Sequence, residues 1–338
     1  MTHFSAGRLT GYTWGAMIAA AALVSLLWMT AAGKKRGLKN GTVPLFGILA
    51  ILLCVLLGRA GYYLCSLNRM QVIGVPFFRL TGGGMMLYGA MIGGLLAVFL
   101  TGKITKTSFG KIADCAAAPA ALMIAAGRFA EYLTGAGYGF SVADWFDPWN
   151  TYNRSFIAWE EPVLLCRFPF AVQDPFYGDW MFAINLPEGL AAIICLVILL
   201  RMRPRKDGGA AALLLMMYAA CQVVFESMRE DEVLRLNFMK INMLVSALVL
   251  LGILILCLKK AGANPRHALF ATALLFLLAG VATAMEFALE QKIGFLTWMR
   301  ADLCYLVMGL CSLGMLITVV KEWKKAFPVR NHPLTGGQ

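Results

Sequence analysis

The stretch IADCAAAPAALMIAAGRFAEY, residues 112–132, is apolar over most of its length but carries Arg128 and Glu131 near its end. About twenty apolar residues are enough to cross the hydrocarbon core of a bilayer as one helix. A guanidinium at that depth costs on the order of 3 kcal/mol or more, so chains keep one mainly where it meets a carboxylate or an anionic ligand. The stretch therefore predicts a membrane span that carries a candidate anion site.

Similar apolar runs recur along the whole chain of 338 residues, of which 60% are hydrophobic and 14% charged. They predict an all-α polytopic membrane protein with about nine transmembrane helices, at about 12–32, 44–66, 84–102, 112–132, 183–202, 209–228, 238–258, 267–287 and 301–320. The longest polar-leaning segment, 133–182, is too short for more than a small external head. We expect a seven-helix body, 1–260, and an extra two-helix C-terminal extension, 261–338, with a basic tail.

Lysine and arginine alternate in density between successive loops, and this alternation predicts the orientation. Loops such as GKKRGLK at 33–39, RMRPRK at 201–206 and the tail after 320 are basic, whereas the loops between them carry fewer cations. The positive-inside rule then places the N-terminus outside and the C-terminus in the cytoplasm of a bacterial cell membrane. The net charge of +12 is explained by orientation and anionic membrane lipids, so no nucleic-acid partner is expected.

The cysteines and histidines indicate no metal or cofactor site. Of the nine cysteines, eight fall in or at the ends of spans, and Cys166 alone falls in the external loop. The three histidines, His3, His267 and His332, lie outside the spans, and no Cys-x-x-Cys or Cys/His spacing is present. We therefore predict neither a bound metal nor a disulfide framework.

Charged and polar residues in and beside the spans gather near the external side. In the predicted topology this group comprises Arg59, Tyr88, Arg128, Glu131, Glu188, Glu226 and Arg229. Arginines beside carboxylates in a low-dielectric cavity suit a phosphate headgroup. Two simpler interpretations stay open: Arg128 and Glu131, spaced i,i+3, can form an intrahelical pair, and Arg59 can extend toward the interface. Gly89 and Gly93, like the glycines at 135–139, also suit helix packing and turns.

Several motifs, in order, resemble the bacterial prolipoprotein diacylglyceryl transferase family from about residue 10 to about residue 260. They are GRAGYYLCSLN at 58–68, GGGMMLYGAMIGG at 82–94, TKTSFGKIADCAAAP at 105–119, AGRFAEYLTGAGYG at 126–139, NLPEG at 185–189 and QVVFESMRED at 222–231. The resemblance implies a transferase that moves the diacylglyceryl group of phosphatidylglycerol onto the lipobox cysteine of a prolipoprotein and releases glycerol phosphate. Its partners are then phosphatidylglycerol and prolipoprotein signal peptides.

The resemblance also assigns residues. Arg128 matches the family's essential arginine, Gly139 the closing glycine of that signature, Glu188 the acid of the loop-return motif, and Glu226 with Arg229 the late pair. Together with the charge pattern, this predicts a site with two groups of members. The catalytic candidates are Arg128, Arg229, Glu131 and Tyr88, and the lipid-binding candidates are Arg59, Glu188, Glu226, Gly89, Gly139 and Trp14.

The chain departs from the family pattern around these arginines. Tyr88-Gly89-Ala90 stands where the family usually has His-Gly-Gly, Trp14-Gly15 where it has Tyr-Gly, and Glu131 where it has Asn. A histidine implicated as the base is therefore absent, and Glu131 or Tyr88 is expected to replace it. Two alternatives remain beside the transferase: a related lipid transferase with another acceptor, and a non-catalytic lipid-binding scaffold or transporter.

Overall fold

The chain folds into a bundle of nine helices in the part that the structure, a computed structural model, describes: residues 3–6, 9–65, 76–78, 84–134, 137–141, 169–173, 180–202, 204–229, 235–236, 239–290, 292, 294–296 and 299–329. The helices are α1 (Thr13–Lys35), α2 (Thr42–Cys65), α4 (Leu87–Thr105), α5 (Phe109–Thr134), α7 (Asn185–Arg201), α8 (Gly209–Phe225), α9 (Ile241–Ala261), α10 (Pro265–Leu289) and α11 (Ala301–Ala326).

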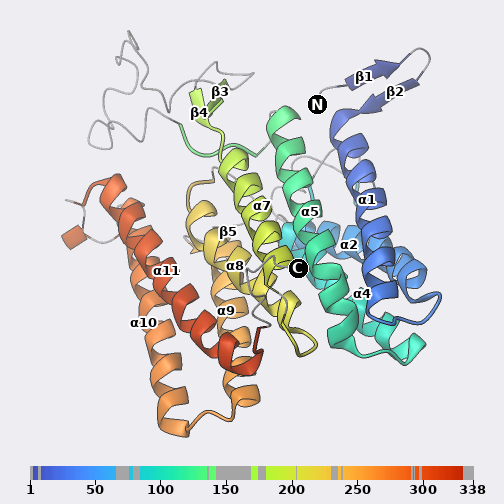
Figure 1. Ribbon diagram of the computed structural model, residues 1–338. Helices are drawn as coiled ribbons and strands as arrows, with labels where there is room; N and C mark the ends of the chain where they lie inside the picture. Colours follow the sequence, from blue (N-terminus) through green and yellow to red (C-terminus); the bar gives the residue numbers. More distant parts are fainter. Residues whose placement is uncertain are drawn as a thin grey trace, which may run out of the picture.

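Three short antiparallel hairpins accompany the helices. They pair β1 (His3–Ala6) with β2 (Leu9–Tyr12), β3 (Ala171–Gln173) with β4 (Trp180–Phe182), and β5 (Arg235–Leu236) with β6 (Met239–Lys240). All three lie in segments before or between helices, toward the upper end of the bundle as drawn in Figure 1. The predicted head, 133–182, is described only at its two ends, and Cys166 lies outside the described residues.

The predicted class, an all-α polytopic membrane protein, is confirmed. Seven of the helices are long and apolar enough to cross a membrane. The other two, α7 and α8, have 17 residues each, which at about 1.5 Å per residue is close to the thickness of the hydrocarbon core. Most predicted boundaries agree within a few residues. The largest difference is in α11, which continues past 320 to Ala326 because Trp323 and Ala326 are fully buried.

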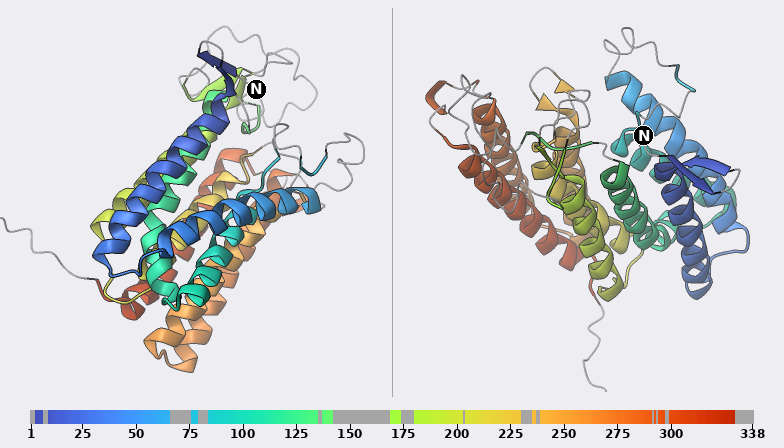
Figure 2. Two further views of the ribbon diagram at one scale, coloured as in Figure 1. Left: turned by 90° about the vertical axis from the view of Figure 1, so that its right-hand side faces the viewer. Right: turned by 90° about the horizontal axis from the view of Figure 1, so that it is seen from above.

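Two helices, α5 and α7, form the centre of the bundle (Figure 1). On one side α1 packs along α5 and α2 packs along α4; on the other side α8 and α9 are followed by α10 and α11. Seen from above, the helices follow each other in an arc from α1 and α2 to α10 and α11 (Figure 2). Because α5 and α7 run antiparallel, the end of one and the start of the other meet on the same side of the membrane.

The two C-terminal helices share the largest hydrophobic core with α7, α8 and α9. Leu213, Leu254, Leu275 and Met308, from four different helices, are all nearly inaccessible in this core. Side-chain hydrogen bonds also join α11 to α8, as Trp323 Nε1 donates to Gly209 O at 2.9 Å. The division into a body and a C-terminal extension therefore stays a prediction. In the structure, α10 and α11 pack against α8 and α9 as parts of the same bundle.

Close packing of α2 on α4 explains two of the glycines. A Cβ atom on Gly89 or Gly93 would lie 2.4 Å from the carbonyl oxygen of Leu57 or Leu53, respectively. Small residues at such positions let the backbones of two membrane helices approach each other. The helix-packing interpretation of these two glycines therefore agrees with the structure.

We expect Gly93→Ala to lower the thermal stability of the purified protein, at a cost of about 1–3 kcal/mol, because the added methyl overlaps the backbone of α2. The neighbouring Gly94 is the matched control, since its Cβ would meet only Cys54 Sγ at 3.7 Å. Gly94→Ala should leave the melting temperature unchanged or raise it slightly. Equal melting temperatures for the two variants in detergent would contradict the close crossing.

Candidate functional site

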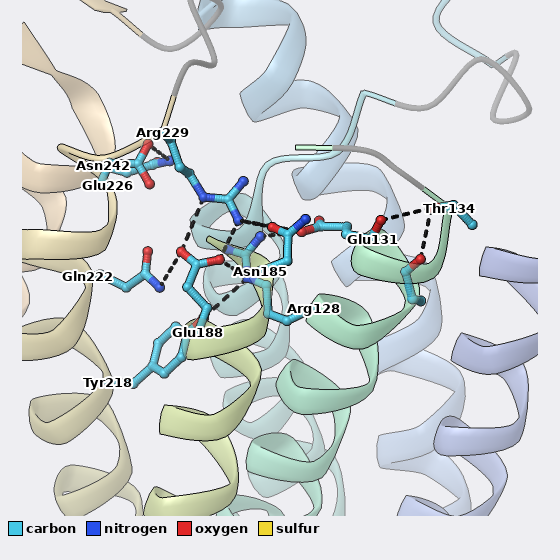
Figure 3. Close-up of polar contacts among 11 residues, drawn as sticks. Arg128, Glu131, Thr134, Asn185, Glu188, Tyr218, Gln222, Glu226, Arg229 and Asn242 are labelled. Carbon is cyan, nitrogen blue, oxygen red and sulfur yellow. Dashed lines mark hydrogen bonds and ion pairs between the residues drawn. The ribbon is translucent and has the colours of Figure 1, made fainter. Parts of the chain in front are cut away.

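Helix ends from α5, α7 and α8 meet at one end of the bundle and bring charged side chains together (Figure 3). Arg128 and Glu131 lie near the C-terminus of α5, Glu188 lies in the first turn of α7, and Arg229 follows the end of α8. The placement of Glu188, Arg128 and Arg229 suits the helix dipoles, because a carboxylate is favoured at a helix N-terminus and cations at helix C-termini. In α7 the first turn also accommodates Pro187, whose missing N–H would have no partner there.

Glu188 is the centre of this cluster. Its carboxylate is fully buried and contacts both arginines: Glu188 Oε2 forms an ion pair with Arg128 Nε at 2.9 Å, and Glu188 Oε1 accepts a hydrogen bond from Arg229 Nε at 3.1 Å. A second nitrogen of Arg229, Nη2, contacts the other carboxylate oxygen, and Gln222 Nε2 donates to Glu188 Oε1 at 3.2 Å. One buried carboxylate therefore fixes two guanidinium groups in place.

Glu131 contacts the same two arginines from the more open side. Its Oε2 lies 2.7 Å from Arg128 Nη1 and 3.5 Å from Arg229 Nη2. The side chain of Glu131 is 26% exposed, whereas that of Glu188 is inaccessible. The intrahelical pair expected from the i,i+3 spacing is thus present, but it belongs to a larger network of two arginines and two carboxylates.

Additional polar groups orient the arginines. Asn185 Oδ1 accepts a hydrogen bond from Arg229 Nη2 at 3.0 Å, and the Tyr218 hydroxyl accepts from Arg128 Nε at 3.5 Å. The remaining terminal nitrogen of Arg128, Nη2, has no hydrogen bond to any residue that the structure describes. An arginine has five N–H donors. The cluster therefore has donor capacity left for an anion.

A short backbone ladder supports the Arg229 segment. Gly139 pairs with Arg229 in an antiparallel bridge. The N–H of Gly139 donates to Phe182 O at 2.7 Å, and the N–H of Phe140 donates to Met228 O at 3.1 Å. A Cβ atom on Gly139 would lie 2.9 Å from Met228 O and 3.0 Å from Phe182 Cβ. Gly139 is therefore required by close approach of three backbone segments.

Glu226 and Tyr88 belong to a second, adjacent network built on α9. Asn242 Nδ2 donates to Glu226 Oε1 at 2.8 Å. Ser246 Oγ donates to Asn242 O at 2.7 Å, so the Tyr88 hydroxyl, which contacts Ser246 Oγ, is left to donate to it. Both Tyr88 and Glu226 are at most 3% exposed. These two predicted site residues are therefore linked to each other through α9, and Glu226 precedes the Arg229 turn directly.

Three other predicted residues make their contacts elsewhere. Arg59 is 1% exposed and donates to the carbonyl oxygens of Pro76, Phe77 and Gly84, with its guanidinium also over the ring of Tyr63. Gly89 lies at the α2–α4 crossing. Trp14, in the first turn of α1, is partly exposed. The lipid-binding roles predicted for these residues stay predictions.

Sequence reasoning missed Tyr218, Asn242 and Ser246. Each is a polar side chain inside an apolar run, and Asn242 and Ser246 are spaced i,i+4 on one face of α9. Polar residues at membrane depth are costly and mark functional positions. That signal was present in the sequence, although only the packing of α8 and α9 shows that these side chains face the arginine cluster and Tyr88.

The sequence profile described as "Prolipoprotein diacylglyceryl transferase" matches residues 2–258. The chain belongs to this family. Curated relatives named phosphatidylglycerol–prolipoprotein diacylglyceryl transferase include one from Bacillus velezensis, 25% identical over 273 residues that cover 78% of this chain and 94% of the relative. Another, from Bacillus licheniformis, is 23% identical over 252 residues, or 73% and 87% of the two chains.

A third relative of the same name, from Halalkalibacterium halodurans, is 24% identical over 252 residues and covers 74% of this chain and 82% of its own. The low identities mark a divergent member of the diacylglyceryl transferase family. The family match ends at residue 258, close to the end of α9. The helices α10 and α11 lie beyond it.

Proposed function

We propose that this membrane protein transfers the diacylglyceryl group of phosphatidylglycerol to the lipobox cysteine thiol of a prolipoprotein. The observation that carries the proposal is the buried Arg128–Glu188–Arg229 cluster at the ends of α5, α7 and α8. Both arginines are at most 7% exposed. Fixed guanidinium groups in a low-dielectric site stabilise developing negative charge far better than they would in water.

The chemistry requires such a site. The cysteine thiolate attacks the glyceryl carbon that bears the phosphate, a carbon–sulfur bond forms, and the carbon–oxygen bond to the phosphate breaks. The phosphate leaves as glycerol phosphate with one additional negative charge, and the thiol proton passes to a base. Arg128 and Arg229 would contact the phosphate oxygens and stabilise that additional charge in the transition state. Membrane lipids in general would contact the outer helix faces.

Glu131 is the group best placed to accept the thiol proton. A carboxylate that is partly exposed at the open side of the cluster can meet an incoming thiol, whereas Glu188 is enclosed by its donors. A phosphate bound to the arginines would replace some of their contacts with Glu131 and release that carboxylate. Tyr88 is less suited, because its hydroxyl is buried against Ser246.

We expect Glu131→Gln to lower kcat about 10²–10⁴-fold, the usual contribution of a general base. Tyr88→Phe should change kcat by less than about fivefold, because the hydroxyl supplies one hydrogen bond to Ser246. Both variants change only one polar group. The opposite order, with Tyr88→Phe the more damaging in a thioether-forming assay, would assign the base to Tyr88.

The proposed setting is the cytoplasmic membrane of a bacterium, with the N-terminus outside and the C-terminus in the cytoplasm. The arginine cluster would then lie near the outer leaflet. The basic residues at the opposite end of the bundle support this orientation. There Arg36 pairs with Asp114, whose carboxylate also accepts hydrogen bonds from Gly208, Ala210 and Ala211 N–H groups at the start of α8.

A direct assay tests the function. Purified full-length protein is incubated with phosphatidylglycerol labelled in its diacylglyceryl group and a peptide containing a lipobox cysteine. We expect labelled thioether-linked peptide and an equal amount of glycerol phosphate, and neither product when the cysteine is replaced by serine. Release of glycerol phosphate without peptide modification would indicate another acceptor. Phospholipid binding with no product would indicate a non-catalytic paralogue.

A further inference from the structure

The C-terminal helices reach the arginine cluster although the family match ends before them. Glu286, in the last turn of α10, is 5% exposed and accepts a hydrogen bond from Ser227 Oγ. Ser227 lies two residues before Arg229 in the turn that follows α8. Burying a carboxylate at membrane depth costs folding free energy, so such a residue is rarely kept without a specific role. Glu286, which lies beyond the residues that the family profile matches, therefore contacts the turn that carries Arg229.

The same turn is held from a second side. Lys240, just before α9, is 4% exposed, and its Nζ donates to Ser227 O at 2.7 Å and to Arg229 O at 2.6 Å. Lys240 therefore fixes the backbone of the turn, while Glu286 fixes its one hydroxyl side chain. Both residues therefore contact the turn that carries the Arg229 guanidinium group.

The last helix adds a third contact. The ring of Tyr305, in the first turns of α11, stacks on Phe140 with centroids 5.8 Å apart and planes at 15°. Phe140 is the residue whose N–H donates to Met228 O, next to Arg229. Both C-terminal helices therefore contact the backbone ladder that carries Arg229, α10 through Ser227 and α11 through Phe140.

We propose that α10 and α11 act as a positioning unit for Arg229, with Glu286 as a positioning residue that acts through Ser227. The proposal rests on the proposed transferase function for its effect on rate. A guanidinium group stabilises a leaving phosphate only when its position is held to a fraction of an ångström, which requires a supporting layer of contacts. In this divergent family member, part of that layer comes from the helices beyond residue 258.

Four variants of the full-length protein test this: Glu286→Ala, Glu286→Gln, Ser227→Ala and the double alanine variant. We expect Glu286→Ala to lower kcat about tenfold or more, as the loss of supporting contacts commonly does. Glu286→Gln keeps an oxygen that can accept the Ser227 hydroxyl proton and should recover most of the rate. In the Ser227→Ala background, Glu286→Ala should cause little further loss, because the two residues act through one contact.

The matched control is Glu322→Ala, in α11 at the opposite end of the bundle. Glu322 is also buried, at 3% exposure, and loses its contacts with His267 and Lys325 when replaced. This variant reports the general cost of removing a buried carboxylate from the C-terminal helices. Its kcat should stay within about twofold of the wild-type value, because it has no contact with the Arg229 turn.

Hydrogen–deuterium exchange gives a readout that does not depend on the reaction. In Glu286→Ala, peptides that cover 137–141 and 225–229 should exchange faster, because the ladder amides of Gly139 and Phe140 and the turn amide of Arg229, which donates to Glu226 O, open more often. In Glu322→Ala they should exchange as in the wild type. If wild-type protein forms no thioether product, the proposed function fails, and the exchange experiment still decides whether Glu286 holds the turn.

Three outcomes would overturn the positioning role. The first is an unchanged kcat in Glu286→Ala. The second is the same fractional loss of kcat from Glu286→Ala in the wild-type and Ser227→Ala backgrounds, which is the signature of a general loss of stability. The third is equal protection of the two peptides in Glu286→Ala and in the wild type.

Discussion

Arg128→Ala is expected to lower kcat for thioether formation about 10³-fold, because the leaving phosphate loses a fixed, desolvated cation in the transition state. The variant also leaves Glu188 with one guanidinium group instead of two. It removes the guanidinium N–H donors that Arg128 of α5 contributes to the cluster. Arg128→Lys keeps the charge but not the planar fork of donors, so it should recover only part of the rate. Steady-state kinetics with labelled phosphatidylglycerol gives kcat for the wild type, Arg128→Ala and Arg128→Lys.

The matched control for this prediction is Arg36→Ala. Arg36 also pairs with a carboxylate of α5, Asp114 at 3.1 Å, but at the opposite end of the bundle, and its side chain is 36% exposed. When Arg36 is removed, the buried Asp114 carboxylate keeps the hydrogen bonds from the Gly208, Ala210 and Ala211 N–H groups, so the fold should be retained. We expect kcat close to the wild-type value. Comparable losses in Arg36→Ala and Arg128→Ala would mean that the proposed phosphate site is wrong.

Glu188→Ala is expected to destabilise the protein by about 3–5 kcal/mol, because it leaves two buried guanidinium groups without their shared counter-ion. Glu188 is fully buried, forms an ion pair with Arg128 and accepts hydrogen bonds from Arg229 and Gln222. The melting temperature in detergent should fall by many degrees, and product formation should be lost with it. Both effects have one physical cause, the mutual repulsion and poor solvation of the two freed cations.

Glu188→Gln separates charge from shape. The amide oxygen can still accept a hydrogen bond from one arginine. The amide nitrogen then points at the second arginine, and because both groups are donors they cannot form a hydrogen bond. We expect a smaller loss of stability than in Glu188→Ala, with activity still strongly reduced. A Glu188→Ala protein that melts at the wild-type temperature would show that Glu188 is not the counter-ion that the geometry indicates.

The membrane class and the helix positions were predictable because they depend on local composition. A run of about twenty apolar residues has few alternatives to a spanning helix in a bilayer, since every backbone polar group must be satisfied within the segment. The prediction was least accurate for α11 and for the short hairpins. In α11 the last turn is held by burial of Trp323 against α8 rather than by its own hydropathy. The strands of the hairpins have two to four residues and are too short to leave a periodic pattern.

The site was predictable in part. The i,i+3 spacing of Arg128 and Glu131 predicts their contact from one helix alone, and the structure contains it. The resemblance added Glu188 and Arg229, and the structure places both in the same cluster. Arg59 was expected to bind lipid, a role that stays a prediction; its guanidinium group contacts the backbone carbonyls of Pro76, Phe77 and Gly84, partners that the sequence did not indicate. The partners of Arg59 depend on the geometry of the segment between α2 and α4, and no periodic pattern in the sequence predicts that geometry.

The sequence by itself determined that this chain spans a membrane several times and that a charge pair lies at one end of its fourth span, because hydropathy and helical spacing are local properties. Only the tertiary structure decided that Glu188 joins Arg128 to Arg229, that Tyr88 is linked to Ser246 and not to the arginines, and that Glu286 of the C-terminal helices holds the Arg229 turn. These contacts join residues between 41 and 158 positions apart. They exist because antiparallel helices bring their ends together, and no local pattern in the chain specifies which ends meet.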